Sequence, residues 1–319
     1  MNRRWLALAA LCLAAAPALV HAQAKTTRII VAFPPGGPVD IVARALAEQL
    51  GRELQQNVFI ENKPGGNGAV AASEVMRSAP DGSTLWLTSV GAAAINPALY
   101  DKLGYDMQRD FTPVSLVVNN VELLVVHPTN PASSAAEFVA ASKKATQPLA
   151  MASTGIGSIP HLAIEQLADA SGARLLHVPY KGAAPAITDV MGGQVAGFFG
   201  DIPGLIGHVK AGKLKAIGLA STTRHPALPD VKTLAEQGIA GVDTNNWYAL
   251  FAAAKTPPAT VDAINQAARR ALTNVVLRDK LLATGADPAP STPQELATLL
   301  AADSDKWARL IRAKKIKAE

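Results

Sequence analysis

The sequence has little cysteine and few aromatic residues. Its one cysteine, Cys12, lies within the first 24 residues, and aromatic residues make up 5% of the 319-residue chain. Beyond residue 24 no thiol is available for a disulfide, a metal or a nucleophile, so the hydrophobic core must supply the stability. No later apolar run reaches the roughly 20 residues that a bilayer span requires. These absences exclude a disulfide-stabilised scaffold, a cysteine-dependent enzyme and a multi-span membrane protein.

An export signal is predicted at the N-terminus. The first 24 residues contain no acidic residue, Arg3 and Arg4 precede an apolar run at 5–20, and small residues follow it. This layout is typical of a secretory signal peptide, whereas a membrane anchor needs a longer run. Leucine precedes the cysteine where a lipoprotein signal has glycine or alanine, so we expect no lipidation. We expect cleavage near Ala22 or Ala24 and a periplasmic product.

The charge pattern favours a small anionic ligand over a nucleic acid. Without Arg3 and Arg4, the formal net charge of +5 falls to +3. Basic residues are scattered except for Lys314, Lys315 and Lys317, which we interpret as a solvated helix end. A mildly positive surface modestly favours anions.

Strands, glycine-rich loops and helices alternate along the chain. This pattern predicts an α/β fold with mainly parallel sheets. Predicted strands occupy 28–33, 57–61, 84–88, 149–152, 174–178, 195–199, 214–220 and 247–252, and two shorter apolar runs occupy 114–118 and 123–126. Predicted helices occupy 39–54, 69–78, 135–144, 161–170, 185–191, 203–211, 258–273, 276–284 and 293–314.

The alternation resets once, which predicts two lobes joined as a hinged clamshell. We assign 1–24 to the signal peptide, 25–120 and 245–319 to lobe 1, and 121–244 to lobe 2. Ligands of such sheets bind beyond the carboxyl ends of the strands. Loops at these ends expose backbone N–H groups and helix starts, both of which suit carboxylates. The loops lie at 34–40, 62–68 and 88–92 in one lobe and at 153–161 and 200–204 in the other.

Motifs along nearly the whole chain resemble those of one family. They are FPPGGPVDIVAR (33–44), ENKPGGNGAVAA (61–72), APDGSTL (79–85), NPALYDKLGYD (96–106), DFTPV (110–114), STGIGSIPHLA (153–163), HVPYKGAAPAITDVMGGQV (177–195), GKLKAIGLAS (212–221), LPDVKTLAEQG (228–238), STPQEL (291–296) and KW (306–307). The chain resembles the Bug family, the periplasmic binding components of tripartite tricarboxylate transporters. The resemblance implies a type II periplasmic binding protein fold, a carboxylate cargo, a membrane permease as partner, and recognition through backbone amides and ordered water.

The candidate ligand-binding residues lie in the strand-end loops. In lobe 1 they are Phe33, Gly36, Gly37, Pro38, Thr88, Ser89 and Val90, and in lobe 2 they are Ser153, Thr154, Gly155, Gly157, Ser158, His161 and Asp201.

Several residues in or near these loops also have a structural interpretation. We expect Asp40 to cap helix 39–54 and loop 62–68 to be mainly structural. Segment 180–182 either reaches the cleft or carries Lys181 as a surface charge, and for Lys181 we favour the surface. His161 is either structural or a ligand contact. Asp201 either caps the following helix or meets an ammonium or hydroxyl group of the ligand.

An enzyme is the competing functional class, and the sequence speaks against it. Ser158, His161 and Asp201 match a hydrolase triad in residue type, but Ser158 and His161 stand only one helical turn apart. The chain has no G-x-S-x-G elbow, Walker loop or HExxH motif. We expect no cofactor and no metal, and a monomer. A sensor subunit that presents its ligand to a receptor remains an alternative to a transport role. The cargo stays open among dicarboxylates, tricarboxylates, acidic amino acids and aromatic acids.

Overall fold

The computed structural model describes residues 26–318, so the predicted signal peptide lies outside the described residues. Ten strands of the described chain form one curved sheet, in the order β2-β1-β3-β9-β4-β7-β5-β6, with β8 and β10 also paired to β4. The strands are β1 (Thr26–Val31), β2 (Asn57–Asn62), β3 (Thr84–Ser89), β4 (Phe111–Val126), β5 (Leu149–Ser153), β6 (Leu175–Pro179), β7 (Gly197–Asp201), β8 (Lys215–Leu219), β9 (Asn245–Ala253) and β10 (Asp287–Pro288).

Helices cover both faces of this sheet. The longer ones are α2 (Pro38–Leu54), α3 (Ala69–Met76), α6 (Ala135–Lys144), α7 (Ile159–Ser171), α8 (Ala183–Met191), α9 (Ile202–Lys210), α10 (Pro258–Thr273), α11 (Val275–Thr284) and α12 (Pro293–Lys314). The short ones are η1 (Gly66–Gly68), η2 (Gly91–Ile95), α4 (Asn96–Leu99), α5 (Met107–Asp110) and η3 (Ala235–Gln237). The described residues include no helix with the length and apolar character to cross a membrane.

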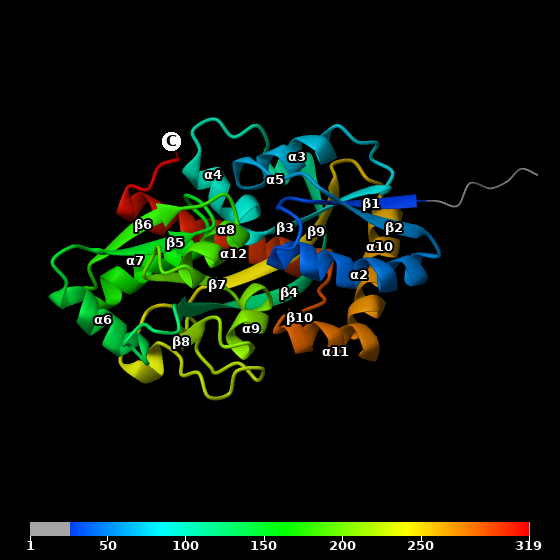
Figure 1. Ribbon diagram of the computed structural model, residues 1–319. Helices are drawn as coiled ribbons and strands as arrows, with labels where there is room; N and C mark the ends of the chain where they lie inside the picture. Colours follow the sequence, from blue (N-terminus) through cyan, green and yellow to red (C-terminus); the bar gives the residue numbers. More distant parts are fainter. Residues whose placement is uncertain (1–25, 319) are drawn as a thin grey trace, which may run out of the picture.

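The sheet has two halves that meet along β4. In the first half, β1 pairs in parallel with β2 and β3, and β9 runs antiparallel between β3 and β4. In the second half, β5 pairs in parallel with β6 and β7, and β4 runs antiparallel to β7 and β8. Figure 1 shows the halves side by side, with β4 and β9 running between them. We call them the first and the second half below.

The apolar runs at 114–118 and 123–126 carry the chain from the first half of the sheet into the second. They belong to the single 16-residue strand β4, whose first part pairs with β9 and whose last residues pair with β7 and β8. The polar residues between the runs do not end the strand because their backbone groups remain in the ladder with β9. Register shifts at Pro113 and between Leu116 and Val118 take up the irregularities.

Four apolar clusters hold the helices on the sheet. In the first half, one cluster contains Trp86, Trp247 and Trp307, and the cluster on the opposite face packs α2 and α10 on the sheet. The second half has a cluster under α6 and α7 and another under α8 and α9. Burial of this kind contributes about 25 cal/mol per Å² of apolar surface, so large contiguous clusters fix the loops that emerge at their edges.

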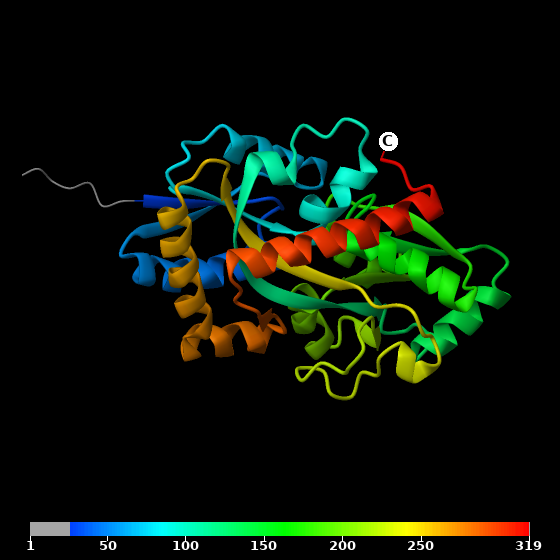
Figure 2. The same cartoon turned by 180° about the vertical axis from the view of Figure 1, so that it is seen from behind.

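Helix α12 lies across the joint between the halves, as Figure 2 shows. It begins with a capping box, where the Thr292 hydroxyl accepts from the Glu295 amide and the Glu295 carboxylate accepts from the Thr292 amide. Near its other end, Lys314 forms an ion pair with Asp169 of α7. The helix therefore contacts elements of both halves.

Candidate functional site

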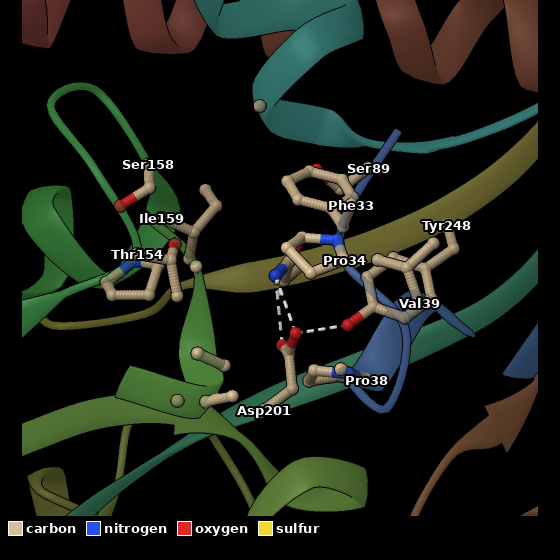
Figure 3. Close-up of a pocket in the computed structure, with 18 of the residues that line it drawn as sticks. Phe33, Pro34, Pro38, Val39, Ser89, Thr154, Ser158, Ile159, Asp201 and Tyr248 are labelled. Atoms are coloured by element: carbon tan, nitrogen blue, oxygen red, sulfur yellow. Dashed lines mark hydrogen bonds between the residues drawn. The ribbon is translucent and has the colours of Figure 1, made fainter. Parts of the chain in front are cut away.

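An inner pocket lies between the two halves, at the carboxyl ends of β1, β3, β5 and β7 (Figure 3). Its volume is about 60 Å³. Its walls consist mainly of glycine, proline and apolar side chains, with a few polar groups between them. The lining residues are Phe33, Pro34, Pro35, Gly37, Pro38, Val39, Ser89, Gly91, Thr154, Ser158, Ile159, Pro160, Gly182, Ala183, Ala184, Pro185, Phe198, Gly200, Asp201, Asn246 and Tyr248.

A larger outer chamber of about 550 Å³ adjoins the inner pocket. Both cavities are lined by Phe33, Pro34, Thr154 and Gly182, so they form one cleft. The chamber also has three aromatic or basic side chains and several loop glycines. The remaining lining residues are Ala32, Pro64, Gly65, Gly66, Tyr100, Gly155, Ile156, Tyr180 and Lys181.

The first loop is held by Asp40, though not as the expected helix cap. The cap position of α2 is Gly37, which has no side chain, and Pro38 follows it. Asp40 instead accepts hydrogen bonds from the Gly36 amide, Arg44 Nε and Asn62 Nδ2, each at 2.9 Å. The capping prediction was wrong because the carboxylate reaches back to the loop and sideways to Asn62.

These bonds fix Asp40 as a charged structural anchor. Burial alone would raise its pKa, but the hydrogen bonds from Arg44, Gly36 and Asn62 hold the pKa of Asp40 below its ordinary value. Arg44 is therefore occupied by Asp40 and does not line the pocket. The amides at the start of α2 are left without a side-chain cap.

The second-half loop is built on two stacked histidines. Ser158 caps α7, its hydroxyl accepting from the His161 amide and donating to the Gly155 carbonyl. The His161 ring accepts from the Gly157 amide at 3.0 Å and stacks on His177 with 3.7 Å between the ring centroids. His161 thus shapes the loop from behind, and its side chain does not line the inner pocket.

Both histidines are held neutral. Burial lowers the pKa of His161 to about 3, helped by the neighbouring His177, and burial lowers the pKa of His177 to about 4. The His177 ring also lies 2.5 Å from the Ser153 hydroxyl. Ser158, His161 and Asp201 do not form a catalytic triad, because the His161 ring bonds to Gly157 and Asp201 bonds elsewhere.

The base of the pocket is formed by Asp201 and two residues of β9. Asn246 Nδ2 donates to both carboxylate oxygens of Asp201 at 3.0 Å, and the Tyr248 hydroxyl donates to Asp201 Oδ2. Figure 3 shows the Asp201 carboxylate pointing toward the Tyr248 hydroxyl, with Thr154 and Ser158 on one wall and Phe33 and Ser89 on the other. Asp201 occupies the cap position of α9 but makes no capping hydrogen bond, so its carboxylate serves the pocket base.

A second buried carboxyl group, Glu122, lies directly opposite Asp201 on β4. Burial and the nearby charge of Asp201 raise the pKa of Glu122 well above its ordinary value, so Glu122 holds the proton of the pair. Burial raises the pKa of Asp201 to about 6, and the hydrogen bonds from Tyr248, Glu122 and Asn246 limit the rise. We call Glu122 and Asp201 the acid pair.

Half of the sequence-predicted site residues line the inner pocket. They are Phe33, Gly37, Pro38, Ser89, Thr154, Ser158 and Asp201. The other seven lie around it. Gly155 lines the outer chamber, Gly36 bonds to Asp40, Gly157 and His161 support the second loop, Ser153 bonds to His177, and Thr88 and Val90 are buried.

Sequence reasoning missed Glu122, Asn246 and Tyr248, together with residues 183–185 at the start of α8. A signal was present for the first two, since each is a polar residue inside an apolar strand segment, in VELLVV (121–126) and NNWYAL (245–250). Buried polar groups need partners, so such residues predict a buried polar cluster. Their pairing joins segments more than 40 residues apart, which the sequence alone did not place together.

The fold is that of periplasmic solute-binding proteins, and such proteins are not enzymes. A model of the family described as "Tripartite tricarboxylate transporter family receptor" (TctC) matches residues 42–316. The chain belongs to this family, which confirms the resemblance seen in the sequence and the two-lobed fold that it implied.

Three solved structures are similar to the chain. The periplasmic binding protein BugD is 30% identical, with 92% of this chain and 99% of BugD covered and a TM-score of 0.86. Rpa4515 of R. palustris, solved with adipate, is 29% identical, with coverage of 92% and 98% and a TM-score of 0.88. MatC (Rpa3494) from Rhodopseudomonas palustris, with bound malate, is 32% identical, with coverage of 90% and 98% and a TM-score of 0.83.

Proposed function

We propose that this protein captures a small carboxylate in the periplasm and delivers it to the permease of a tripartite tricarboxylate-type transporter. The observation that carries the proposal is the convergence of three helix starts on the inner pocket. The first residues of α2, α7 and α8 all line it, and neither α2 nor α8 has a side-chain cap. Uncapped amides and positive dipole ends form a site for an anionic oxygen group.

The size of the cleft supports a ligand longer than a single carboxylate group. The inner pocket accommodates one end, and the remainder of the molecule extends past Phe33 and Thr154 into the outer chamber. Lys181, with an exposed side chain, is the basic residue of that chamber among the described lining residues. The similar proteins with malate and adipate support a dicarboxylate of four to six carbons as the first class to test.

The transport role rests on membership of a transporter receptor family. A sensor role would use the same pocket and differ only in the membrane partner. Co-purification with a membrane permease encoded beside this protein would favour transport, and co-purification with a sensor kinase would favour signalling. The predicted export signal supports periplasmic capture, with the binding protein acting as a monomer.

A thermal-shift screen of residues 25–319 against a panel of carboxylates tests the proposal. A ligand present at about 100 times its dissociation constant adds roughly 2.7 kcal/mol of stability at 25 °C. We expect one or more di- or tricarboxylates, acidic amino acids or aromatic acids to raise the melting temperature and to be recovered unchanged. Gly207→Ala, a change on the exposed face of α9, is the matched control and should respond like the wild type. A panel without any stabilising carboxylate, or conversion of the ligand, would contradict the proposal.

A further inference from the structure

We propose that the base of the pocket selects carboxylates that also carry a hydrogen-bond donor, a hydroxyl or an ammonium group, through the acid pair and its partners Asn246 and Tyr248. This inference rests on the proposed function and names the ligand class within it. None of the four residues acts on a reacting atom. Asp201 faces the ligand, and Glu122 positions it from behind.

The base of the pocket retains a negative charge. Glu122 is fully buried and lies opposite Asp201 in the β4–β7 ladder, with Asn246 Nδ2 at 3.4 Å from Glu122 Oε1. Two buried carboxylates side by side cannot both be ionised, so the pair keeps one proton and one negative charge. The described chain has no lysine or arginine in the lining of the inner pocket to neutralise that charge.

The donor groups at the base of the pocket are directed at Asp201. Asn246 and Tyr248 line the pocket, but both direct their donor groups at Asp201 and not at the cavity. The buried Asn246 Oδ1 has no partner within residues 26–318. Asn246 bonds to both carboxylate oxygens of Asp201 and Tyr248 bonds to Oδ2, so these donors of the base are directed at Asp201. Because Asp201 lines the pocket, the base presents the negative charge of the acid pair to the ligand.

Donors and acceptors lie on different sides of the pocket. The amides at the starts of α2, α7 and α8 supply donors for a ligand carboxylate, whereas the base of the pocket supplies acceptors. A ligand that placed a second ionised carboxylate against the buried Asp201 would face like-charge repulsion. A hydroxyl or ammonium group at that position supplies the missing proton and forms a charge-assisted hydrogen bond.

The experiment compares ligands that differ only in this donor. We would titrate residues 25–319 by calorimetry at pH 7.5 with succinate, malate and aspartate, and with glutarate, 2-hydroxyglutarate and glutamate. Hydrogen bonds to charged groups are strong enough that the donor-bearing member of a series should bind about tenfold more tightly or better. In Asp201→Asn the side chain keeps its size but loses its charge, so we expect the preference to fall below about threefold.

Two further variants distinguish selection from damage to the fold. Gly207→Ala lies on the exposed face of α9, outside both cavities, and should leave the preference as it is. Lys181→Ala changes the outer chamber and should leave the preference as it is. If Asp201→Asn does not fold, Glu122→Gln tests the same pair from behind, and we expect its preference for donor-bearing ligands to change without loss of carboxylate binding.

The outcomes separate this inference from the proposed function. Equal binding of the matched ligands, or an unchanged preference in a folded Asp201→Asn, overturns the inference and leaves carboxylate capture standing. Tight binding of succinate with uptake of a proton, seen as a buffer-dependent binding enthalpy, also overturns it, because the acid pair would then meet the ligand in its fully protonated form. Failure of every carboxylate to bind overturns both proposals.

Discussion

The two halves touch at Gly204, where an added methyl group would not fit. Gly204 lies in α9 of the second half and faces Pro38, the first residue of α2 in the first half. A Cβ atom added at Gly204 would lie 2.8 Å from Pro38 Cγ and 3.4 Å from its Cδ. Ordinary carbon contacts begin near 3.5–4.0 Å, so the halves would have to separate by roughly 1 Å at this point. The Pro38 ring is closed on its own backbone, so only a change of ring pucker is available to move Cγ away.

We therefore expect Gly204→Ala to weaken ligand binding without destabilising the free protein. Overpacking of this kind costs about 1–3 kcal/mol, which corresponds to a loss of affinity of about 5- to 150-fold. Helix α9 itself should become more stable, because alanine is more favourable than glycine inside a helix by about 1 kcal/mol. Affinity and stability should consequently change in opposite directions.

Gly207→Ala is the matched control on the same helix. A Cβ atom at Gly207 meets no atom within 4 Å, so Gly207→Ala should stabilise the helix without creating a contact with Pro38. Calorimetry gives the affinity, urea denaturation the stability, and small-angle scattering the compaction on ligand binding. If the two variants bind ligand equally well, or if both lose affinity, closure against Pro38 does not govern binding.

Three other predictions follow from the site and its supports. Gly37→Val places a branched side chain in the inner pocket and should weaken binding more than Lys181→Ala does, and calorimetry giving the reverse order would count against the first loop as the carboxylate site. Because His161 and His177 have lowered pKa values of about 3 and 4, the folded state resists their protonation. Their contribution to the free energy of unfolding should be full above pH 6.5 and fall by pH 5, by about 2 kcal/mol for the buried His161 and by less for the more exposed His177. The acid pair has the opposite effect, because its raised pKa values stabilise the folded state more as the pH falls from about 6 to 4. His177→Gln removes one histidine and leaves the acid pair in place, so the free energy of unfolding, measured by urea denaturation, should fall less steeply with falling pH. An unchanged pH dependence would refute the role of the histidines. Thr292→Ala removes the capping box of α12 and should cost about 0.5–2 kcal/mol, with ligand affinity unchanged.

The local elements could be predicted because short-range signals mark them. Pro38 and Thr292-Pro293 mark the starts of α2 and α12, and the predicted segment 293–314 coincides with α12. Gly285 ends α11 in the left-handed conformation that glycine favours. Each of these signals acts within a few residues, so the sequence carries them without reference to the fold.

Strand β4 could not be predicted as one element because its continuity is a tertiary effect. Asn119 and Asn120 interrupt the apolar pattern and indicate a turn when only neighbours are considered. In the fold, both residues pair with β9, and the Asn120 side chain donates to the Asn246 carbonyl at 3.0 Å. Pairing with a strand more than 120 residues away overrides the local signal.

The candidate site was predicted in its loops and missed in its base. The loops carry glycine, proline and hydroxyl residues in runs, as at 33–38 and 153–158, and these runs are visible in the sequence. The base depends on Glu122, Asp201 and Asn246, which come from three strands. They lie close together only because of the β4–β7 and β4–β9 registers. Asp201 was found because it follows a strand, whereas its proton-sharing partner Glu122 gave only the weak signal of a buried acid.

A crystal structure of residues 25–319 with the tightest-binding carboxylate of the panel tests carboxylate capture between the halves most directly. We expect the ligand in the inner pocket, one carboxylate group within hydrogen-bond distance of the amides at the starts of α2, α7 or α8, and a hydroxyl or ammonium group on Asp201. Ligand density on the outer surface, with the inner pocket holding only water, would contradict the assignment of the site.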